Sequence, residues 1–153
     1  AHMGIGIGQL FNVTPNRRAN ISPYVNTDSI DPNLGIIRVD DASTGKPIAT
    51  VWNFAIHGTC GSADNMKSSA DIMGAANIDL EAKEDVGIAM FINGDAGDIA
   101  PGNGMCDGAP ISFAGGPIIA AKVREVRKSV KASPDVKLEG HSQVVNFGKT
   151  NMN

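Results

Sequence analysis

The first third of the chain carries the short apolar runs that are typical of β-strands. Residues 4–12 alternate glycine with isoleucine and other apolar residues, which predicts a strand with little side-chain bulk. Residues 34–39 and 48–56 are two more such runs, and the turn between them, built on Ser43-Thr44-Gly45, predicts a hairpin. Residues 14–33 form an irregular stretch rich in Asn, Ser, Pro and Asp. An irregular loop of this length is usually functional or flexible.

The rest of the chain alternates helical and strand patterns. A helix is predicted from the capping region at Ser68-Ser69-Ala70-Asp71 to about Lys83, with its inward positions at Ile72, Ala75, Ala76 and Leu80. Residues 86–92 form a continuous apolar run that predicts a buried strand, and residues 138–147 alternate like a closing strand. This order predicts an α/β protein with a mixed sheet and flanking helices.

The second predicted helix begins at Pro117 and has two distinct sides. One side is apolar and the other is basic, and the basic side is most simply a solvated face. The apolar side carries Ile118, Ile119, Val123, Val126 and Val130, and the opposite side carries Lys122, Arg124, Glu125, Arg127 and Lys128.

Composition narrows the classes of function. A chain of 153 residues with 42% hydrophobic residues is long enough for one domain with a real core, and no apolar run approaches membrane-spanning length. The formal charge of −3 argues against a nucleic-acid partner. Cys60 and Cys106 lack metal-ligand spacing; a single disulfide is possible, but two ordinary thiols are favoured. Residues 1–3 resemble a cloning scar, so His2 is left out of the search for a site.

His57 is the first candidate for chemistry. It ends the apolar run 48–56, and a neutral imidazole at a strand end is a suitable zinc ligand. A zinc site needs at least three protein ligands, however, and the only other native histidine is His141, which is predicted on a surface strand. From the residues alone, a hydrogen-bonded structural histidine is the favoured interpretation.

Two further segments carry polar groups. The loop after the run 86–92 presents Gly94, Asp95, Gly97 and Asp98, which offer backbone N–H groups to an anion or carboxylates to a cation. It lacks the Walker lysine and the EF-hand spacing, so a tight turn is favoured on spacing alone. Arg17 and Arg18 offer guanidinium groups that suit a carboxylate or an oxyanion, although most such pairs are solvated surface charge.

Taken in order, six segments resemble the catalytic domain of the neutral/alkaline (non-lysosomal) ceramidases and their shorter microbial relatives. Each motif alone is weak, but the ordered series is fairly specific and runs from about residue 10 to 103, with a tail to 147. The segments are Asn16-Arg17-Arg18, residues 31–39, residues 45–49, Asn53-Phe54-Ala55-Ile56-His57-Gly58-Thr59, residues 69–74, and residues 91–101 with the sequence FINGDAGDIAP.

The resemblance implies a zinc-dependent amidohydrolase that cleaves the N-acyl bond of ceramide to give sphingosine and a fatty acid. It assigns His57 as a zinc ligand, Arg17 as a contact to the substrate carbonyl or oxyanion, and the loop with Gly94, Asp95, Gly97 and Asp98 as the floor of the cleft. Ala100 stands where the family has its nucleophilic serine. An alanine has no oxygen to attack a carbonyl, so the serine-dependent mechanism cannot run through this position.

Three explanations for Ala100 remain open: an engineered inactive variant, a relative that uses zinc-bound water directly, or a member with another activity or none. The family's other zinc ligands lie in segments that this chain lacks, so the resemblance implies that residues 4–153 are one partial catalytic domain. We therefore expect weak zinc binding or none by the chain alone, with a lipid-like N-acyl substrate and the remainder of the catalytic domain as partners. A location that is secreted or at a membrane surface follows the family. The alternative is a non-catalytic domain that binds lipid or a partner protein.

Overall fold

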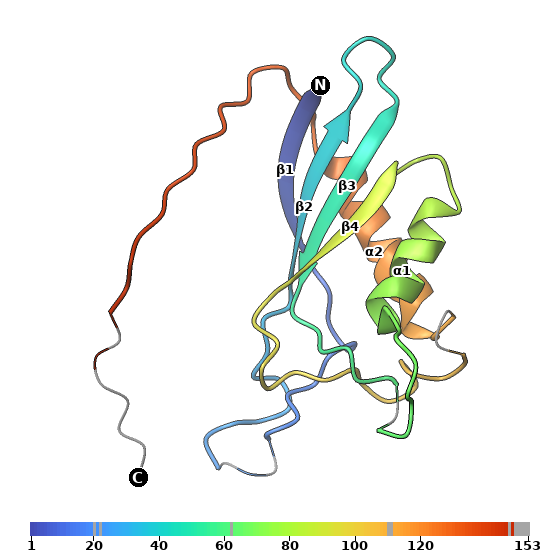
Figure 1. Ribbon diagram of the computed structural model, residues 1–153, viewed down its shortest axis with the longest axis vertical. Helices are drawn as coiled ribbons and strands as arrows, with labels where there is room; N and C mark the ends of the chain where they lie inside the picture. The colour runs from blue at the N-terminus through green and yellow to red at the C-terminus, as the bar shows by residue number, and fades with distance from the viewer. Residues whose placement is uncertain (20, 22, 62, 110–111, 147, 149–153) are drawn as a thin grey trace.

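The computed structural model describes residues 1–146 and 148, except residues 20, 22, 62, 110 and 111. The strands form one sheet in the order β1-β2-β3-β4, in which β1–β2 and β2–β3 are antiparallel and β3–β4 is parallel (Figure 1). This mixed sheet with two helices confirms the predicted α/β class. The elements are β1 (His2–Gln9), β2 (Asn33–Asp40), β3 (Pro47–Phe54), α1 (Asp71–Glu81), β4 (Ile88–Asn93) and α2 (Gly115–Ser129).

Both helices cover the same face of the sheet, and the core lies between them and β2 and β3 (Figure 1). Each large aliphatic or aromatic side chain that is fully buried there contributes about 1.5–3 kcal/mol. The indole N–H of Trp52 donates to the Asn77 Oδ1 of α1 at 2.8 Å, so the most buried strand also fixes the position of this helix. The largest fully buried side chains include Trp52, Phe54, Leu34, Ile36, Ile72, Leu80 and Ile119.

The glycines of β1 let α2 approach the strand very closely. A Cβ atom on Gly6 would lie 2.4 Å from Val130 Cγ2, and one on Gly8 would lie 2.3 Å from Val126 Cγ2. Such distances are sterically forbidden, so this side of β1 must be free of side chains. Because side chains alternate along a strand, Ile5 and Ile7 point to the opposite face of the sheet.

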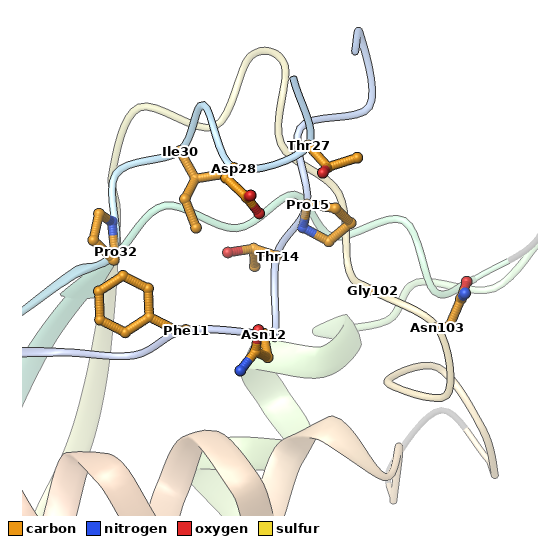
Figure 2. Close-up of a pocket in the computed structure, with 10 residues that line it drawn as sticks. All are labelled: Phe11, Asn12, Thr14, Pro15, Thr27, Asp28, Ile30, Pro32, Gly102 and Asn103. Atoms are coloured by element: carbon orange, nitrogen blue, oxygen red, sulfur yellow. The ribbon is translucent and has the colours of Figure 1, made fainter. Parts of the chain in front are cut away.

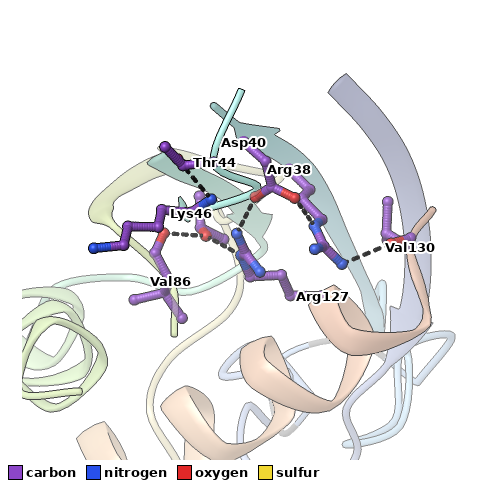
Figure 3. A network of polar contacts seen from close by, with 8 residues as sticks. Arg38, Asp40, Thr44, Lys46, Val86, Arg127 and Val130 are labelled. Atoms are coloured by element: carbon purple, nitrogen blue, oxygen red, sulfur yellow. Dashed lines mark hydrogen bonds and ion pairs between the residues drawn. The ribbon is translucent and has the colours of Figure 1, made fainter. Parts of the chain in front are cut away.

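A buried polar network joins α2 to β2 and β3 (Figure 3). Arg127 donates to Asp40 Oδ1 and to Thr50 Oγ1, both at 2.7 Å, and Arg38 donates to Asp40 Oδ2 at 2.6 Å. Burial lowers the pKa of the Arg127 guanidinium, and the neighbouring Asp40 carboxylate opposes that shift. Such a pair is costly to break on one side, because the remaining charge stays buried and unpaired.

This network corrects the prediction for the basic side of the second helix. Arg124 and Arg127 are only 8% and 5% exposed and pair with Asp79 and Asp40, whereas Ile118, predicted to face inward, is 43% exposed. Charge alone suggested a solvated face, but the acidic partners are supplied by β2 and α1, which the helical period cannot reveal.

The C-terminal segment also differs from the prediction. Residues 134–146 form no strand and run away from the sheet (Figure 1), and Leu138 and the surface residue His141 are strongly exposed. Within the described part of the chain, an isolated antiparallel bridge between Ser133 and Met3 joins the start of this region to β1. The apolar residues Leu138, Val144 and Val145 are all exposed, so the alternating pattern gains no packing against the sheet. Phe147, the last residue of the predicted strand, lies outside the described residues.

Strand β4 is predicted from the sequence to be buried, but Ile88, Met90 and Ile92 are each more than half exposed. Their side chains lie on the face of the sheet that neither α1 nor α2 covers. No helix within the described ranges is long and apolar enough to cross a membrane.

The close packing of α2 on β1 predicts that Gly6→Ala lowers the free energy of unfolding by about 1–3 kcal/mol, because the new methyl group overlaps Val130. Chemical denaturation of the purified variant measures the change. Gly140→Ala is the matched control, because a Cβ there meets nothing within 4 Å. The double variant Gly6→Ala/Val130→Ala should recover part of the loss. A Gly6→Ala protein as stable as the control contradicts the close packing.

Candidate functional site

The candidate site lies at the sheet edge where the parallel strands β3 and β4 both end. The carboxyl ends of parallel strands are where α/β proteins commonly bind ligands. The buried residues Ala55 and Ile56 carry the chain from β3 to His57, and the Gly94 N–H after β4 donates to Phe54 O at 3.0 Å. A Cβ on Gly94 would lie 3.0 Å from Ala55 N, so a glycine permits this close approach.

His57 is partly buried and is oriented by the loop that follows β4. Its Nδ1 atom lies 2.9 Å from Ala96 O. A carbonyl oxygen only accepts hydrogen bonds, so this contact requires a proton on Nδ1, and in the neutral tautomer that has it the lone pair is on Nε2. Metal-binding histidines commonly have their other ring nitrogen fixed in this way.

Arg17 contacts the same loop one residue further on. Its backbone N–H donates to Asp98 O at 2.8 Å, and its guanidinium Nη2 donates to Gly97 O at 2.7 Å. The side chain is otherwise exposed and retains further donors for a ligand. His57 and Arg17 lie far apart in the sequence, yet they bind the carbonyls of adjacent residues.

Ala100 lies in a short backbone ladder between residues 13–17 and 98–102. The Ala100 N–H donates to Pro15 O at 3.3 Å, the Gly102 N–H donates to Val13 O at 2.7 Å, and Asn16 forms a bridge with Ile99. This ladder joins the long irregular stretch before β2 to the loop after β4. It brings Ala100 next to the segment that carries Arg17.

Asn16 is the central polar residue of this arrangement. It is only 3% exposed, and its amide group donates to Ser29 O at 2.8 Å and to Asp98 Oδ2 at 2.7 Å. Its Oδ1 accepts the Arg18 N–H at 2.9 Å. In the sequence Asn16 stands out only as a member of a motif, because nothing in its spacing indicates that one side chain connects three segments.

The aspartates of the loop do not form a cation site. Asp98 accepts the hydrogen bond from Asn16, Asp95 is exposed, and the Ile99 N–H donates to Ala96 O at 3.2 Å in the tight turn that spacing favoured. Among the residues that the structure describes, no three histidine, cysteine or acidic side chains are grouped to hold a metal ion.

Hydrogen bonds to the side chain of Asp71 hold the loop that follows His57. The carboxylate of Asp71 accepts the N–H groups of Cys60 and Gly61 at 3.2 and 3.0 Å, and it also accepts the Ile72 N–H at the start of α1. Asp71 has a φ angle of 54°, which is rare for a residue with a side chain. It thus acts across the loop as well as at the predicted helix start.

Cys60 and Cys106 form a disulfide, with their Cα atoms 4.9 Å apart. The favoured prediction of two free thiols is therefore wrong. The two cysteines are 46 residues apart in the sequence, and only the folding of both loops over the N-terminal end of α1 brings them together. The bridge ties the loop after His57 to the loop after Ala100.

A cavity of about 590 Å³ adjoins the ladder on the side of Thr14 and Pro15 (Figure 2). Phe11, Ile30 and the two prolines give it apolar walls, and the buried Thr14 Oγ1 has no hydrogen-bond partner among the described residues. The cavity has a volume typical of small-molecule sites. Its lining does not include His57, Arg17 or Ala100.

The residues present do not fit a complete zinc site. His57 offers one nitrogen with suitable support from Ala96, but a protein zinc site needs at least three protein ligands, and the described residues supply no such group. Among the described residues, His57 is therefore a single supported donor and not a complete metal site.

Comparison with known proteins gives the fold a context. The structure matches the crystal structure of neutral ceramidase from Pseudomonas aeruginosa with a TM-score of 0.68 and 24% sequence identity over 83% of this chain. This chain has the fold of one part of a neutral ceramidase. A ceramidase complexed with C2 matches with a TM-score of 0.67 and 22% identity over the same share of the chain. These likenesses confirm, at the level of the fold, the resemblance that the ordered motifs indicated.

The chain spans 22% of the length of each of these two ceramidases. No protein-family model matches it, and no curated protein matches it in sequence. The ceramidase-like fold therefore rests on structural likeness together with the ordered motifs.

The role of Asn16 predicts that Asn16→Ala lowers the free energy of unfolding by about 1–3 kcal/mol, because three hydrogen bonds are lost in a buried setting. Urea denaturation measures the change, and Asn33→Ala at an exposed position is the control. Equal stability of the two variants would contradict a central structural role for Asn16.

Proposed function

We propose that this chain supplies part of the active centre of a zinc-dependent amidohydrolase like neutral ceramidase. The complete protein would hydrolyse the N-acyl bond of ceramide or a similar lipid to a long-chain amine and a fatty acid. The observation that carries the proposal is the convergence of His57 and Arg17 on the adjacent carbonyls of Ala96 and Gly97, beside Ala100.

In this proposal His57 is one ligand of the zinc ion and binds it through Nε2. The hydrogen bond from Nδ1 to Ala96 O supports this role, because it fixes both the tautomer and the orientation of the ring. The other ligands come from parts of the protein outside these 153 residues. Zinc, when bound, would act there as a Lewis acid toward the amide carbonyl.

Arg17 is proposed to hold the oxygen of the scissile carbonyl. One Nη atom is engaged by Gly97 O, which orients the planar guanidinium, and the remaining N–H groups are free to donate to an oxygen that gains negative charge. A donor positioned in this way favours the transition state over the ground state, because the hydrogen bonds strengthen as the charge develops.

Ala100 limits the chemistry that this site performs. In this proposal it occupies the position in the ladder where the family has its serine, but its methyl group is not a nucleophile. The proposed enzyme therefore needs an attacking water molecule. The same residue favours the second candidate function, a non-catalytic ceramidase-like domain that binds a lipid or a protein partner.

The proposal makes a metal-binding prediction that compares two histidines. The isolated chain should bind zinc weakly or not at all in a calorimetric titration, because it contributes one ligand. The full-length protein that contains these residues should hold one zinc ion, and His57→Ala should reduce its zinc content by at least about tenfold, as expected for loss of a ligand.

His141→Ala is the matched control for this experiment, because His141 is exposed and lies in the segment that leaves the sheet. It should leave the zinc content unchanged. Tight one-to-one binding by the isolated chain would refute the idea that the other ligands lie elsewhere. Unchanged zinc in the His57→Ala protein would refute the role of His57.

The two candidate functions differ in their response to Ala100→Ser. If the site retains catalytic geometry, the serine variant of the full-length protein should hydrolyse an N-acyl sphingoid substrate at least about 100-fold faster than the parent, because a nucleophile is restored. Liquid chromatography of the released fatty acid measures the rate. Adding His57→Ala to the serine variant should abolish the gain. If neither the parent nor the serine variant cleaves the amide, the binding function is supported instead.

A further inference from the structure

The sheet has a second face that neither helix covers. We call it the open face and define it by the register of the four strands. Residues that pair directly across neighbouring strands share a face. The open face consists of Met3, Ile5, Ile7 and Gln9 of β1, Asn33, Gly35, Ile37 and Val39 of β2, Ala49, Val51 and Asn53 of β3, and Ile88, Met90 and Ile92 of β4.

The open face is more uniformly apolar than the covered one. It carries no charged residue, and its polar side chains are Asn53, which donates to Ile92 O at 2.9 Å, and the pair Gln9 and Asn33 at one end of β1 and β2. The helix-covered face, in contrast, includes Arg38, Asp40 and Thr50. A sheet with one solvated face normally has polar side chains on that side.

Strand β1 shows most clearly that large apolar side chains lie on the uncovered face. Its glycines face α2, while Ile5 and Ile7 on the open face are 74% and 72% exposed. At the other edge of the sheet, Ile88 is 62% exposed. Branched aliphatic side chains thus line both edges of the open face, where they gain nothing from the core that the helices form.

We infer that the open face is an internal surface of a larger domain, covered by a further layer of the same polypeptide. Apolar faces of two sheets pack about 10 Å apart in layered proteins, and a uniformly apolar face suits such a layer. The lengths of the matched ceramidases support this inference, because this chain spans 22% of each of them and most of each lies outside the aligned part. The inference rests on the proposed function only in requiring a longer polypeptide.

The size of the face argues against a second copy of the chain as its occupant. Four strands about 4.8 Å apart, each presenting three or four side chains about 6.8 Å apart, give a flat area of roughly 400–500 Å². A stable complex buries about 800 Å² on each partner. A layer within one polypeptide needs no such area, because the connecting chain holds it at a high effective concentration.

The charge of the face argues against a lipid surface. Segments that lie on membranes usually combine an apolar surface with lysine or arginine, which attract anionic headgroups. The open face has no basic residue, and the chain carries a formal charge of −3.

The test measures the accessibility of single cysteines at two apolar positions with equal exposure. Ile92 on the open face and Ile78 on α1 are both 54% exposed. In the isolated chain, Ile92→Cys and Ile78→Cys should react with a maleimide at similar rates, as followed by mass spectrometry of the labelled peptides. In the full-length protein, Ile92→Cys should react at least about 100-fold more slowly than Ile78→Cys, because a packed layer must open before the thiol is reached.

Similar rates at the two positions in the full-length protein would overturn the inference. So would a reading frame that encodes only these 153 residues. Protection of Ile92→Cys in the isolated chain that rises with protein concentration, together with a dimer mass by light scattering, would assign the face to a second copy. Protection in the full-length protein only after addition of phosphatidylcholine vesicles would assign it to lipid.

The labelling result is independent of catalysis and of zinc. A full-length protein that protects Ile92→Cys but holds no zinc would refute the proposed function and support the covered face. A zinc-loaded, active protein in which Ile92→Cys is labelled rapidly would support the proposed function and refute the covered face. The milder variant Met90→Cys, on the same face, provides a second position if Ile92→Cys does not fold.

Discussion

The close approach of α2 to the glycine side of β1 is the constraint on which the rest of this structure depends. It sets the helix layer directly against the backbone of an edge strand, where a Cβ atom on Gly6 or Gly8 would overlap Val130 or Val126. With α2 held there, Arg127 reaches Asp40 and Thr50, and α1 packs beside it over β3 and β4. All helical cover is therefore concentrated on one face, and the aliphatic side chains of β1 are directed to the other.

The candidate site depends on a different kind of interaction, in which backbone groups position the side chains. The ladder between residues 13–17 and 98–102 joins two irregular segments, and Asn16 connects them to a third. The carbonyls of Ala96 and Gly97 then orient His57 and Arg17. The Cys60–Cys106 disulfide and Asp71 restrain the loop on the other side of His57. A loop region can thus hold a rigid polar arrangement without regular secondary structure.

Our proposals give two features of the chain a common explanation in a larger domain. His57 is a supported but solitary donor, and the open face is an apolar surface without a partner among the described residues. Both are expected for one part of a protein whose remaining layers complete the core and the site. The ceramidase-like fold, matched over 83% of this chain but only 22% of the ceramidase from Pseudomonas aeruginosa, agrees with this explanation. Ala100 takes part in this fold through its backbone N–H, which donates to Pro15 O, and its side chain has no atom that could act as a nucleophile.

The sequence by itself determined the hairpin, both helices, the inward side of α1 and the two strand ends that carry His57 and Gly94, because these depend on local periodicity and turn chemistry. The ordered motifs also determined the ceramidase-like resemblance. Only the tertiary structure decided the burial of Arg124 and Arg127, the disulfide, the role of Asn16 and the failure of residues 138–146 to form a strand. Each of these depends on whether residues that are distant in the sequence come into contact. Side-chain spacing along the chain carries no information about such partners, because folding alone brings them within hydrogen-bond or bonding distance.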